Sequence, residues 1–470
     1  MSWSSNGYNY TTEHLPGKKE YKVFIECYTY NQKEYVRDMF EGIVRQETDF
    51  PYFAVVIDDA SDDGTQEIIK EYCERYPDKI GALLAQENIF GKKESYGIWQ
   101  DFLVQFSDGA EYIATCEGDD YWTDTHKLQI QTDYMDSHPE CMMYLHNAWW
   151  LDCRTGEKRR ADTFECSDGR RLDMSELIAI KKGHSATASR MYRRQILDAP
   201  DFIYECSVGD YPASLYSASV GYVYYSDKPM CLYRFMSKGS TSVLQEDSLA
   251  YRFYHRFGVI RFLLQFDVMT RFLYHADISD KIREFMLSLL SVLDGESAVD
   301  FWQTYNEKYY ITETEEWIEL LDHYIRQLSD DGYICEELTD MISEYDKIVI
   351  MGTGKYAALL TKQLTDNGFS ISGYARSQIR DEEHTYNGLP VWRLDEIPYM
   401  QGEFLLLVGI LPKIDDGIYE SLLTAHILNY VNPYNMADLY RCRYRAKEGN
   451  LTGTSVDACK TNDIGAGNIG

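Results

Sequence analysis

The stretch YKVFIECYTYNQKEYVRDMFEGIVRQETDFPYFAVVIDD, residues Tyr21–Asp59, decides the fold of this chain. Its first apolar run, Tyr21–Tyr28, predicts a strand, and a second run, Phe53–Ile57, predicts another. Between them, apolar side chains recur at helical spacing, at Tyr35, Val36, Met39, Phe40, Ile43 and Val44. Strands that alternate with helices are typical of a parallel sheet, so the sequence predicts the α/β class.

The same alternation continues after Asp59. We expect two further helices and two further strands, in the order Thr65–Tyr76, Gly81–Ala85, Tyr96–Phe106 and Tyr112–Cys116. Two of the predicted strands run out into aspartate pairs, Asp58-Asp59 and Asp119-Asp120. Because ligands of open α/β sheets bind beyond the carboxyl ends of the strands, both pairs are expected at one ligand site.

The rest of the chain divides into further predicted segments. After Pro139 the pattern indicates mixed strands, with candidates at Met142–His146, Ser185–Met191 and Gly221–Tyr225. Long helical stretches follow, and then a new strand at Lys347–Met351. The predicted organisation is a flexible amino terminus (1–19), a sheet domain (20–244), a helical region (245–345), a small α/β module (346–440) and a disordered tail (441–470).

Composition and charge exclude several classes of partner. The net charge of −30 repels polyanions, so we expect no nucleic acid partner. No apolar stretch is long enough for a transmembrane helix, and the amino terminus lacks the features of a signal peptide. Eleven cysteines without a CxxC pair favour reduced thiols in the cytoplasm. The segment Tyr251–Tyr274 fits either a buried helix or a basic amphipathic helix at the inner face of a membrane.

The sequence Cys116–Trp122, CEGDDYW, has the form of an acidic metal loop. Mg²⁺ and Mn²⁺ prefer carboxylate oxygens and keep positions open for phosphate oxygens. A departing nucleoside diphosphate gains negative charge that such an ion can neutralise. The loop therefore predicts Mn²⁺ or Mg²⁺ beside a diphosphate.

Four motifs in order give the chain a family resemblance. They are Thr29-Tyr30-Asn31, Asp58-Asp59-Ala60-Ser61-Asp62-Asp63-Gly64-Thr65, CEGDDYW and Gly209-Asp210-Tyr211. With these motifs the segment Tyr21–Ser242 resembles glycosyltransferase family 2, whose members have the GT-A fold, a nucleotide-binding mixed sheet. The resemblance implies an inverting enzyme that moves a sugar from a nucleotide-sugar donor, UDP-linked by family habit, to a hydroxyl acceptor in surface glycan synthesis.

The resemblance also implies roles for single residues. Asp59 would hold the nucleoside, Asp119 would contact the ribose, and Asp120 would bind the metal. Tyr28, Thr29 and Asn31 belong to the implied nucleotide-binding set, with Tyr28 and Thr29 lining the base pocket. Asp210 matches the catalytic base, which takes the proton from the acceptor hydroxyl.

Plainer structural roles stay open for the same residues. The acids between Asp58 and Asp63 also suit a turn that caps a helix at Thr65, and Asp210 suits a helix cap. His146 and His184 could line the acceptor side or serve as hydrogen-bonded structural histidines. An inactive sugar-binding protein therefore remains an alternative.

The sequence Tyr233-Arg234-Phe235-Met236 departs from the family pattern. Methionine stands where family members often have a histidine that helps at the diphosphate. Metal binding is then expected to rest on Asp120 alone. Arg234 and Lys238 are expected as diphosphate contacts, or else as ordinary surface ion pairs.

The carboxyl-terminal module carries the sequence IVIMGTGKYA, residues Ile348–Ala357. Gly352, Gly354 and Ala357 fit the G-x-G-x-x-A fingerprint, which predicts a Rossmann-like turn. This leaves an NAD(P)-binding oxidoreductase as an alternative, although no carboxylate stands at Gly373-Tyr374-Ala375-Arg376, where the ribose-binding acid is expected. We interpret the module as an interaction or regulatory unit, and a homodimer contact is an equal alternative.

Overall fold

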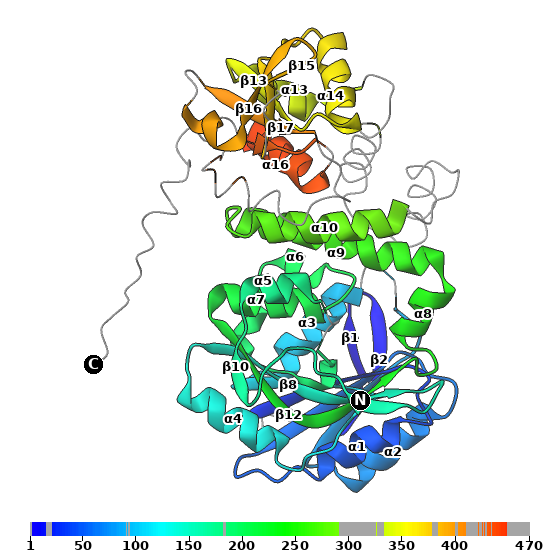
Figure 1. Cartoon of the computed structure of the whole chain (residues 1–470). Coiled ribbons are helices and arrows are strands. Elements are labelled where there is room, and N and C mark those ends of the chain that lie inside the picture. Colours follow the sequence, from blue (N-terminus) through cyan, green and yellow to red (C-terminus); the bar gives the residue numbers. More distant parts are fainter. Residues whose placement is uncertain are drawn as a thin grey trace, which may run out of the picture. The chain divides into compact units, whose positions relative to one another are not determined.

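Figure 1 shows the computed structural model of the chain. It describes residues 2–15, 21–90, 92, 95–181, 185–290, 326, 333–377, 384–399, 403–409, 422, 425, 427, 430–433 and 435–448. The chain forms two compact units. The first comprises Met1–Phe266 and Glu307–Thr312, and the second comprises Asp267–Asn306 and Glu313–Gly470.

The first unit is built on a mixed sheet of twelve strands among the described residues. Its main path runs β1-β2-β5-β4-β3-β6-β11-β8-β12-β10, with β7 paired to β12 and β9 to β8. The strands are β1 (Ser2–Ser5), β2 (Tyr8–Glu13), β3 (Val23–Thr29), β4 (Tyr52–Asp58), β5 (Ile80–Ala85), β6 (Tyr112–Glu117), β7 (Tyr121–Trp122), β8 (Cys141–Asp152), β9 (Lys158–Arg160), β10 (Gly169–Arg171), β11 (Met191–Arg193) and β12 (Tyr222–Phe235).

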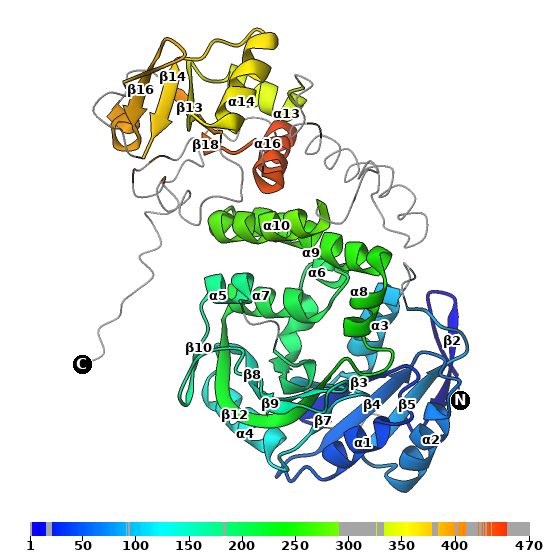
Figure 2. The same cartoon turned by 45° about the vertical axis from the view of Figure 1, so that its right-hand side comes forward.

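Helices cover both faces of this sheet (Figure 2). The α-helices are α1 (Val36–Val44), α2 (Thr65–Arg75), α3 (Ser95–Phe106), α4 (Lys127–Ser137), α5 (Met174–Ala179), α6 (Asp201–Tyr204), α7 (Asp210–Val220), α8 (Thr241–Asp247) and α9 (Leu249–Met269). Two short 3₁₀ helices lie at Thr187–Ser189 and Arg194–Asp198.

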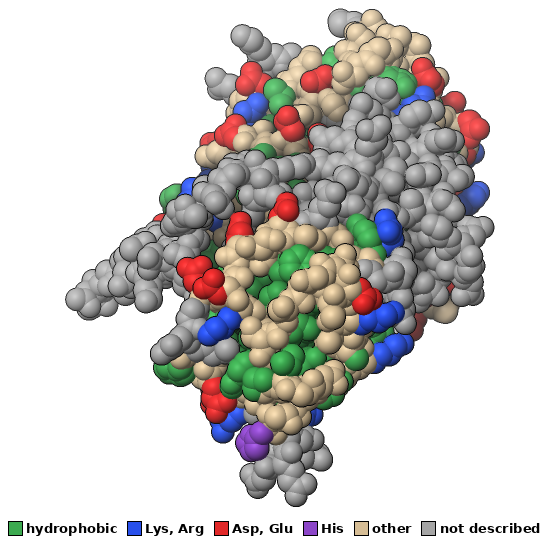
Figure 3. Space-filling model, turned by 90° about the horizontal axis from the view of Figure 1, so that it is seen from above, with side chains coloured by type: hydrophobic (Ala, Val, Ile, Leu, Met, Phe, Trp, Pro, Cys, Tyr) green, Lys and Arg blue, Asp and Glu red, His purple; other side chains and the backbone are tan. Residues whose placement is uncertain are grey.

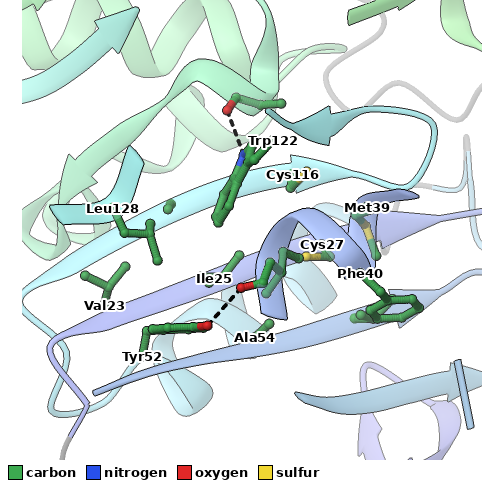
Figure 4. Packing of buried hydrophobic residues seen from close by; sticks show 14 of the residues in the cluster. Val23, Ile25, Cys27, Met39, Phe40, Tyr52, Ala54, Cys116, Trp122 and Leu128 are labelled. Atoms are coloured by element: carbon green, nitrogen blue, oxygen red, sulfur yellow. Dashed lines mark hydrogen bonds between the residues drawn. The ribbon is translucent and has the colours of Figure 1, made fainter. Parts of the chain in front are cut away.

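Side-chain alternation along β3 decides what lies on each face. Val23, Ile25 and Cys27 join one hydrophobic cluster with residues of α1, α2 and α4, part of which is drawn in Figure 4. Successive side chains of a strand point to opposite faces, so Phe24 and Glu26 lie on the other face. There Phe24 packs against Phe102 of α3, with ring centroids 5.7 Å apart. The second face thus carries polar side chains among apolar ones.

The amino terminus is ordered over residues 2–15, which corrects the expectation of a flexible segment over 1–19. β1 and β2 pair antiparallel, and β2 then pairs antiparallel with β5. The physical reason is burial, because Tyr10 is fully buried and its ring lies 5.1 Å from that of Trp3. The hairpin therefore extends the sheet.

The predicted strand Ser185–Met191 was wrong over most of its length. Its described residues instead hold a 3₁₀ turn, Thr187–Ser189, and only Met191 belongs to a strand. The turn is fixed by the indole of Trp122, whose Nε1 donates to Ala188 O over 3.0 Å (Figure 4). The chain consequently enters β11 from a tight turn.

α9 is a buried helix in the part that belongs to the first unit. Phe257, Ile260 and Leu263 are all buried, and the Arg261 guanidinium donates to Glu205 O over 2.7 Å. These contacts favour a buried helix over a lipid-facing helix for the segment Tyr251–Tyr274. No helix among the described residues combines the length and the hydropathy that a membrane crossing requires.

The second unit contains a smaller sheet with the order β15-β16-β14-β13-β17-β18. All its pairings are parallel except that between β15 and β16. The strands are β13 (Lys347–Met351), β14 (Gly373–Arg376), β15 (Thr385–Tyr386), β16 (Leu389–Arg393), β17 (Phe404–Val408) and β18 (Tyr430–Val431). The described helices are α10 (His275–Leu290), α13 (Glu336–Ser343), α14 (Lys355–Asp366), the 3₁₀ helix Leu394–Tyr399 and α16 (Met436–Glu448).

The predicted α/β class with a large mixed sheet, helices and a second, smaller sheet is confirmed. The disordered tail was placed too early, because α16 continues past residue 440 with Arg441 and Cys442 buried. The ten cysteines within the described residues form no disulfide with one another. On the face drawn in Figure 3, basic side chains are interspersed with acidic ones and form no continuous basic patch among the residues described.

Candidate active site

The predicted donor-side residues lie at the ends of three neighbouring parallel strands or just after them. β3 lies between β4 and β6, with Thr29 opposite Asp58 and Tyr28 opposite Glu117. Beyond the strands, Asp59 N donates to Thr29 O over 3.0 Å, and Gly118 N donates to Tyr28 O over 2.9 Å. Both aspartate-containing loops therefore leave the same edge of the sheet, as the sequence predicted.

The loops after β3 and β4 are tied to each other. Asn31 N donates to Ser61 Oγ over 2.8 Å, and Asn31 Oδ1 accepts from Asp62 N over 3.0 Å. The φ angle of Asn31 is +51°, a left-handed conformation that asparagine adopts more readily than most residues. Asn31 thus holds the shape of this edge.

Asp58 is a structural carboxylate at the end of β4. It is fully buried and accepts hydrogen bonds from Thr29 Oγ1 at 3.0 Å and from Gln66 Nε2 at 2.7 Å. Ser61 also donates to it through both N and Oγ. Thr29 is buried as well, so its hydroxyl serves this network.

Asp59 binds the loop that follows β5. Its carboxylate accepts from Asn88 Nδ2 at 2.9 Å, from Ile89 N at 2.8 Å and from Phe90 N at 3.0 Å. Burial raises the pKa of Asp59 to about 6, although the two backbone donors act against the shift. Asp59 therefore shapes this loop. Its role toward a nucleoside remains a prediction.

Asp119 and Asp120 differ in how their oxygens are used. Asp119 Oδ2 accepts from Ser237 Oγ at 2.5 Å, and Asp120 Oδ1 accepts from Arg234 N at 2.8 Å. Asp120 Oδ2 is buried and has no hydrogen-bond partner among the described residues. A buried carboxylate oxygen without a donor is unfavourable unless it meets a proton or a cation.

The environment of Asp120 fits a divalent cation in part. Burial, and then the neighbouring carboxylates of Asp119 and Glu117, raise the pKa of Asp120 well above its ordinary value. A bound cation would relieve this repulsion. Within the described part of the chain, no three His, Cys, Asp or Glu side chains gather closely enough to hold an ion by themselves.

Arg234 is built into the acidic loop. Its Nη1 donates to Asp119 O over 2.5 Å and its Nη2 to Asp38 over 2.5 Å. The guanidinium lies 5.0 Å from the ring of Tyr35 and 4.9 Å from that of Tyr121. Only 10% of its side chain is exposed, whereas Lys238 is exposed. Of the two expected diphosphate contacts, Arg234 is therefore buried against the acidic loop, whereas Lys238 is exposed to solvent.

A polar cluster occupies the second face of the sheet beneath the acidic loop. Glu26 accepts from the hydroxyls of Tyr28, at 2.8 Å, and Tyr192. Burial raises the pKa of Glu26 to about 7 despite these two donors. The ring of Tyr28 lies 5.7 Å from that of Trp99 in α3. The hydroxyl of Tyr28 is thus committed to Glu26, and its ring is the part that could line a base pocket.

Asp210 is the first residue of α7. Its Oδ1 accepts from Tyr211 N at 2.8 Å, and its Oδ2 pairs with Arg190 Nη2 at 3.2 Å. The exposed fraction of the side chain is 22% for Asp210 but only 3% for Arg190. Asp210 therefore remains partly accessible, as an acceptor-side carboxylate needs to be.

Glu117, at the end of β6, lies in the same electrostatic environment. Burial, and then the charges of Asp119 and Asp210, raise its pKa to about 8, while Arg190 acts against the shift. Glu117 therefore interacts electrostatically with Asp119 of the acidic loop and also with Asp210 and Arg190.

His146 is a structural histidine. It is buried, its Nδ1 lies 2.7 Å from Asn147 O, and burial lowers its pKa well below the ordinary value. The acceptor-side role considered for it is therefore not supported. His184 lies outside the described residues.

The glycine turn of the second unit connects β13 to α14. Gly352 has a φ angle of +100°, which glycine adopts without strain. β14 ends at Arg376 and is followed by Ser377, so the described residues there offer no carboxylate to a ribose.

Three residues of this site were not predicted from the sequence. Glu117, Arg190 and Ser237 come from different elements and meet the expected aspartates only in the folded chain. Glu117 stands inside the CEGDDYW motif, which is a signal that could have found it. Arg190 and Ser237 carry no comparable local signal.

A known protein family matches part of the segment that carries these residues. Residues 27–199 match the model of a family described as Glycosyl transferase family 2. The matched segment contains Asp59, Asp119, Asp120 and Arg190, whereas Asp210 lies beyond it. The match supports the resemblance to this family that the motifs predicted, over the segment that holds three of the four motifs.

Curated relatives match over a shorter segment. Uncharacterized proteins of Mycobacterium bovis and Mycobacterium tuberculosis are 44% identical to this chain over 123 residues. That segment is 26% of this chain and 34% of each relative. The match therefore spans about a third of the length of these relatives.

Solved structures show distant likeness. TarS of S. aureus, residues 1–349 in complex with UDP-GlcNAc, is 17% identical, with 78% of this chain and 98% of that chain covered and a TM-score of 0.43. The mannosyltransferase PcManGT of Pyrobaculum calidifontis, in complex with GDP-Man and Mn²⁺, is 14% identical, with 64% and 84% covered and a TM-score of 0.36.

Proposed function

We propose that this chain is an inverting, metal-dependent glycosyltransferase that moves a sugar from a nucleoside diphosphate to an acceptor hydroxyl. The observation that carries the proposal is the buried, unpartnered Oδ2 of Asp120 at the carboxyl edge of the sheet. The family match over residues 27–199 supports the same reaction class. UDP is proposed as the nucleotide, and a surface glycan as the product.

On the donor side, Asp120 would hold Mn²⁺ or Mg²⁺ through Oδ2. Bound there, the ion would supply positive charge to the diphosphate as it departs. Asp119 is held by Ser237 and can accept from a ribose hydroxyl with its remaining lone pairs. Arg234 keeps both aspartates in place, because its main-chain N donates to Asp120 Oδ1 and its guanidinium donates to Asp119 O.

On the acceptor side, Asp210 would act as the general base. Its Oδ1 accepts from Tyr211 N and its Oδ2 from Arg190 Nη2, and 22% of the side chain is exposed, so an acceptor hydroxyl can approach the carboxylate. Taking that proton raises the nucleophilicity of the acceptor oxygen as it attacks the sugar. Attack from the face opposite the diphosphate inverts the anomeric centre.

The second unit is proposed as a Rossmann-like interaction module. Its support is the parallel set β14-β13-β17-β18 and the glycine turn before α14. No described contact favours NAD(P) over other ligands, so the oxidoreductase alternative is not proposed.

Two isosteric variants test the function together. Asp120→Asn should weaken Mn²⁺-dependent UDP binding and transfer alike, because it removes a metal ligand. Asp210→Asn should keep UDP binding but lower transfer by about a hundredfold or more, the usual worth of a positioned general base. Titration calorimetry with UDP, with and without Mn²⁺, measures binding. UDP release from UDP-hexoses, with methyl glycosides as acceptors, measures transfer.

Asp62→Asn is the matched control, because Asp62 lies in the same edge of the sheet but is exposed. It should bind UDP and transfer sugar as the wild type does. Unchanged UDP affinity in Asp120→Asn, or after chelation of the metal, would remove Asp120 from the metal role. Wild-type transfer by Asp210→Asn would leave Asp210 as a helix cap.

A further inference from the structure

Arg190 is a buried cation close to the proposed base. It precedes β11 and has 3% of its side chain exposed. Its Nη2 donates to Ser185 O over 3.0 Å, to Ser185 Oγ over 3.2 Å and to Asp210 Oδ2 over 3.2 Å. An arginine stays charged in proteins, and a buried charge costs several kcal/mol unless it is compensated. Asp210 is the carboxylate that directly compensates Arg190.

Other titratable groups face this pair from the neighbouring elements. Glu117 lies at the end of β6 and Glu26 lies in β3. The positive charge of Arg190 acts to lower the pKa of both glutamates. Glu26 already accepts from Tyr28 and Tyr192, and burial raises the pKa of both glutamates into the neutral range. Burial raises the pKa of the Cys206 thiol to about 12, and the charge of Asp210 acts in the same direction. Among the carboxylates of the described residues, Asp210 is the one that accepts a hydrogen bond from the Arg190 guanidinium.

The sheet explains why Arg190 lies here. Met191 belongs to the hydrophobic cluster on the α1 face, so its neighbours Arg190 and Tyr192 point to the opposite face, where Tyr192 meets Glu26. The 3₁₀ turn before Arg190 is fixed by Trp122, which follows Asp120 by two residues. The position of the guanidinium is therefore set by the same segment that carries the acidic loop.

We propose that Arg190 is a positioning residue that fixes the carboxylate of Asp210 through Oδ2 and keeps it ionised for the acceptor. This inference rests on the proposed function, in which Asp210 is the base. Arg190 acts through Asp210 and not on the donor. Its removal should therefore change transfer and leave nucleotide binding alone.

Arg190→Met tests the inference, with Arg190→Lys as the conservative variant. In Arg190→Met, the transfer kcat should fall by about ten- to a hundredfold, because the base loses its orientation and its counter-charge. The acidic limb of the pH profile should move upward by about one pH unit, since an adjacent cation favours the ionised form of a carboxylate. Arg190→Lys keeps the charge and should recover part of kcat and most of the pH profile. The Kd of UDP with Mn²⁺ should stay at the wild-type value in both.

Arg193→Met is the matched control. Arg193 lies three residues away and donates to backbone carbonyls, those of Cys141, Met135 and His138. The Arg193→Met variant should have a lower unfolding temperature than the wild type, but the pH profile of its transfer reaction should be unchanged. An equal loss of kcat with an unmoved pH profile in Arg190→Met and Arg193→Met would overturn the positioning role.

The double variant Arg190→Met with Asp210→Asn separates this inference from the proposed function. If Arg190 acts through Asp210, the double variant transfers no more slowly than Asp210→Asn alone. Additive losses would contradict the inference while leaving Asp210 as the base. Wild-type transfer by Asp210→Asn would instead contradict the proposed function itself. Should Arg190→Met fail to fold, Arg190→Lys in the Asp210→Asn background gives the same comparison.

Discussion

At the scale of single residues, Arg234 was predicted as a diphosphate contact, and the structure shows its guanidinium bound to the protein itself. Both terminal nitrogens are already engaged, one by Asp119 O and the other by Asp38. Two aromatic rings flank the planar guanidinium, an arrangement that a lysine cannot reproduce.

Arg234→Lys should therefore lower stability and UDP affinity together. The loss of its hydrogen bonds to Asp119 and Asp38 should cost about 1–3 kcal/mol of the free energy of unfolding. Urea unfolding and calorimetry with UDP and Mn²⁺ measure the two effects. Lys238→Met, at an exposed position, should leave stability unchanged. If it alone weakens UDP binding, Lys238 is the diphosphate contact. Full UDP affinity in a destabilised Arg234→Lys would show that the hydrogen bonds of the Arg234 guanidinium do not contribute to donor binding.

The site could be predicted from the sequence where its residues lie in motifs. Asp119 and Asp120 follow a strand directly, so their placement needed only the strand and its direction. Arg190 was missed because its partner is 20 residues away, and Ser237 because its partner is 118 residues away. Contacts of this kind depend on strand order, which local patterns do not contain.

At the scale of elements, the strands and helices with strong periodicity were predicted closely. The predicted strand Phe53–Ile57 is β4, Tyr52–Asp58, and the predicted helix Thr65–Tyr76 is α2, Thr65–Arg75. The amino-terminal hairpin was missed although Asn6-Gly7 is a strong turn signal. Its strands are short, and only packing on β5 makes such a pair stable.

Gly42 in α1 shows how closely one helix approaches the acidic segment. A Cβ atom at this position would lie 2.9 Å from both N and O of Trp122. These are backbone atoms of β7 and cannot rotate away. Gly42→Ala should therefore push α1 and β7 apart and destabilise the first unit by about 1–3 kcal/mol.

Urea unfolding followed by tryptophan fluorescence measures this cost. Gly209→Ala is the control, because a Cβ atom there meets nothing within 4 Å and the φ angle of Gly209 is −88°. It should unfold with the wild type. A Gly42→Ala protein of wild-type stability would mean that α1 shifts without cost.

At the scale of the whole molecule, the second unit is closed by a buried ionic network. His275 Nδ1 lies 2.6 Å from Asp267, and His275 Nε2 lies 2.7 Å from Asp438 of α16. Arg441 pairs with the same Asp438 at 2.9 Å. The network joins residues 163 positions apart in the sequence. It was not predicted, because single histidines and acids in helices carry no sign of their partners.

The network makes the stability of the second unit depend on pH. Burial and Arg441 act to lower the pKa of His275, but the carboxylates outweigh them and raise it above 6.5. Its contribution is then complete below about pH 6.5 and is lost as pH rises through the folded-state pKa. Burial acts to raise the pKa of Asp438, but Arg441 and His275 outweigh it and lower it below 3.8. That contribution is present above about pH 3.8 and is lost as pH falls through the folded-state pKa.

His275→Gln should therefore remove the loss of stability at high pH and lower stability near neutrality, by about 3–5 kcal/mol for a broken buried pair. Protection factors from hydrogen exchange in α10 and α16 measure this locally. The wild type should lose protection there as pH rises above about 6.5, whereas His275→Gln should start low and change little. An identical pH dependence in the two proteins would show that His275 is not the titrating group.

The register shift in β12 limits which insertions and deletions the relatives of this protein can tolerate in evolution. Between Ser226 and Cys231 the strand advances five residues while its partner β8 advances two, from His146 to Ala148. Beyond the shift, β12 carries Arg234 to the acidic loop and leads to Ser237, which also contacts this loop. Helix α7, which begins with Asp210, leads into the same strand. Side chains alternate along a strand, so one residue inserted or deleted here would turn Arg234 to the opposite face. The segment from Asp210 to Ser237 should thus be inherited at constant length, while the exposed turn between β8 and β9 is free to vary.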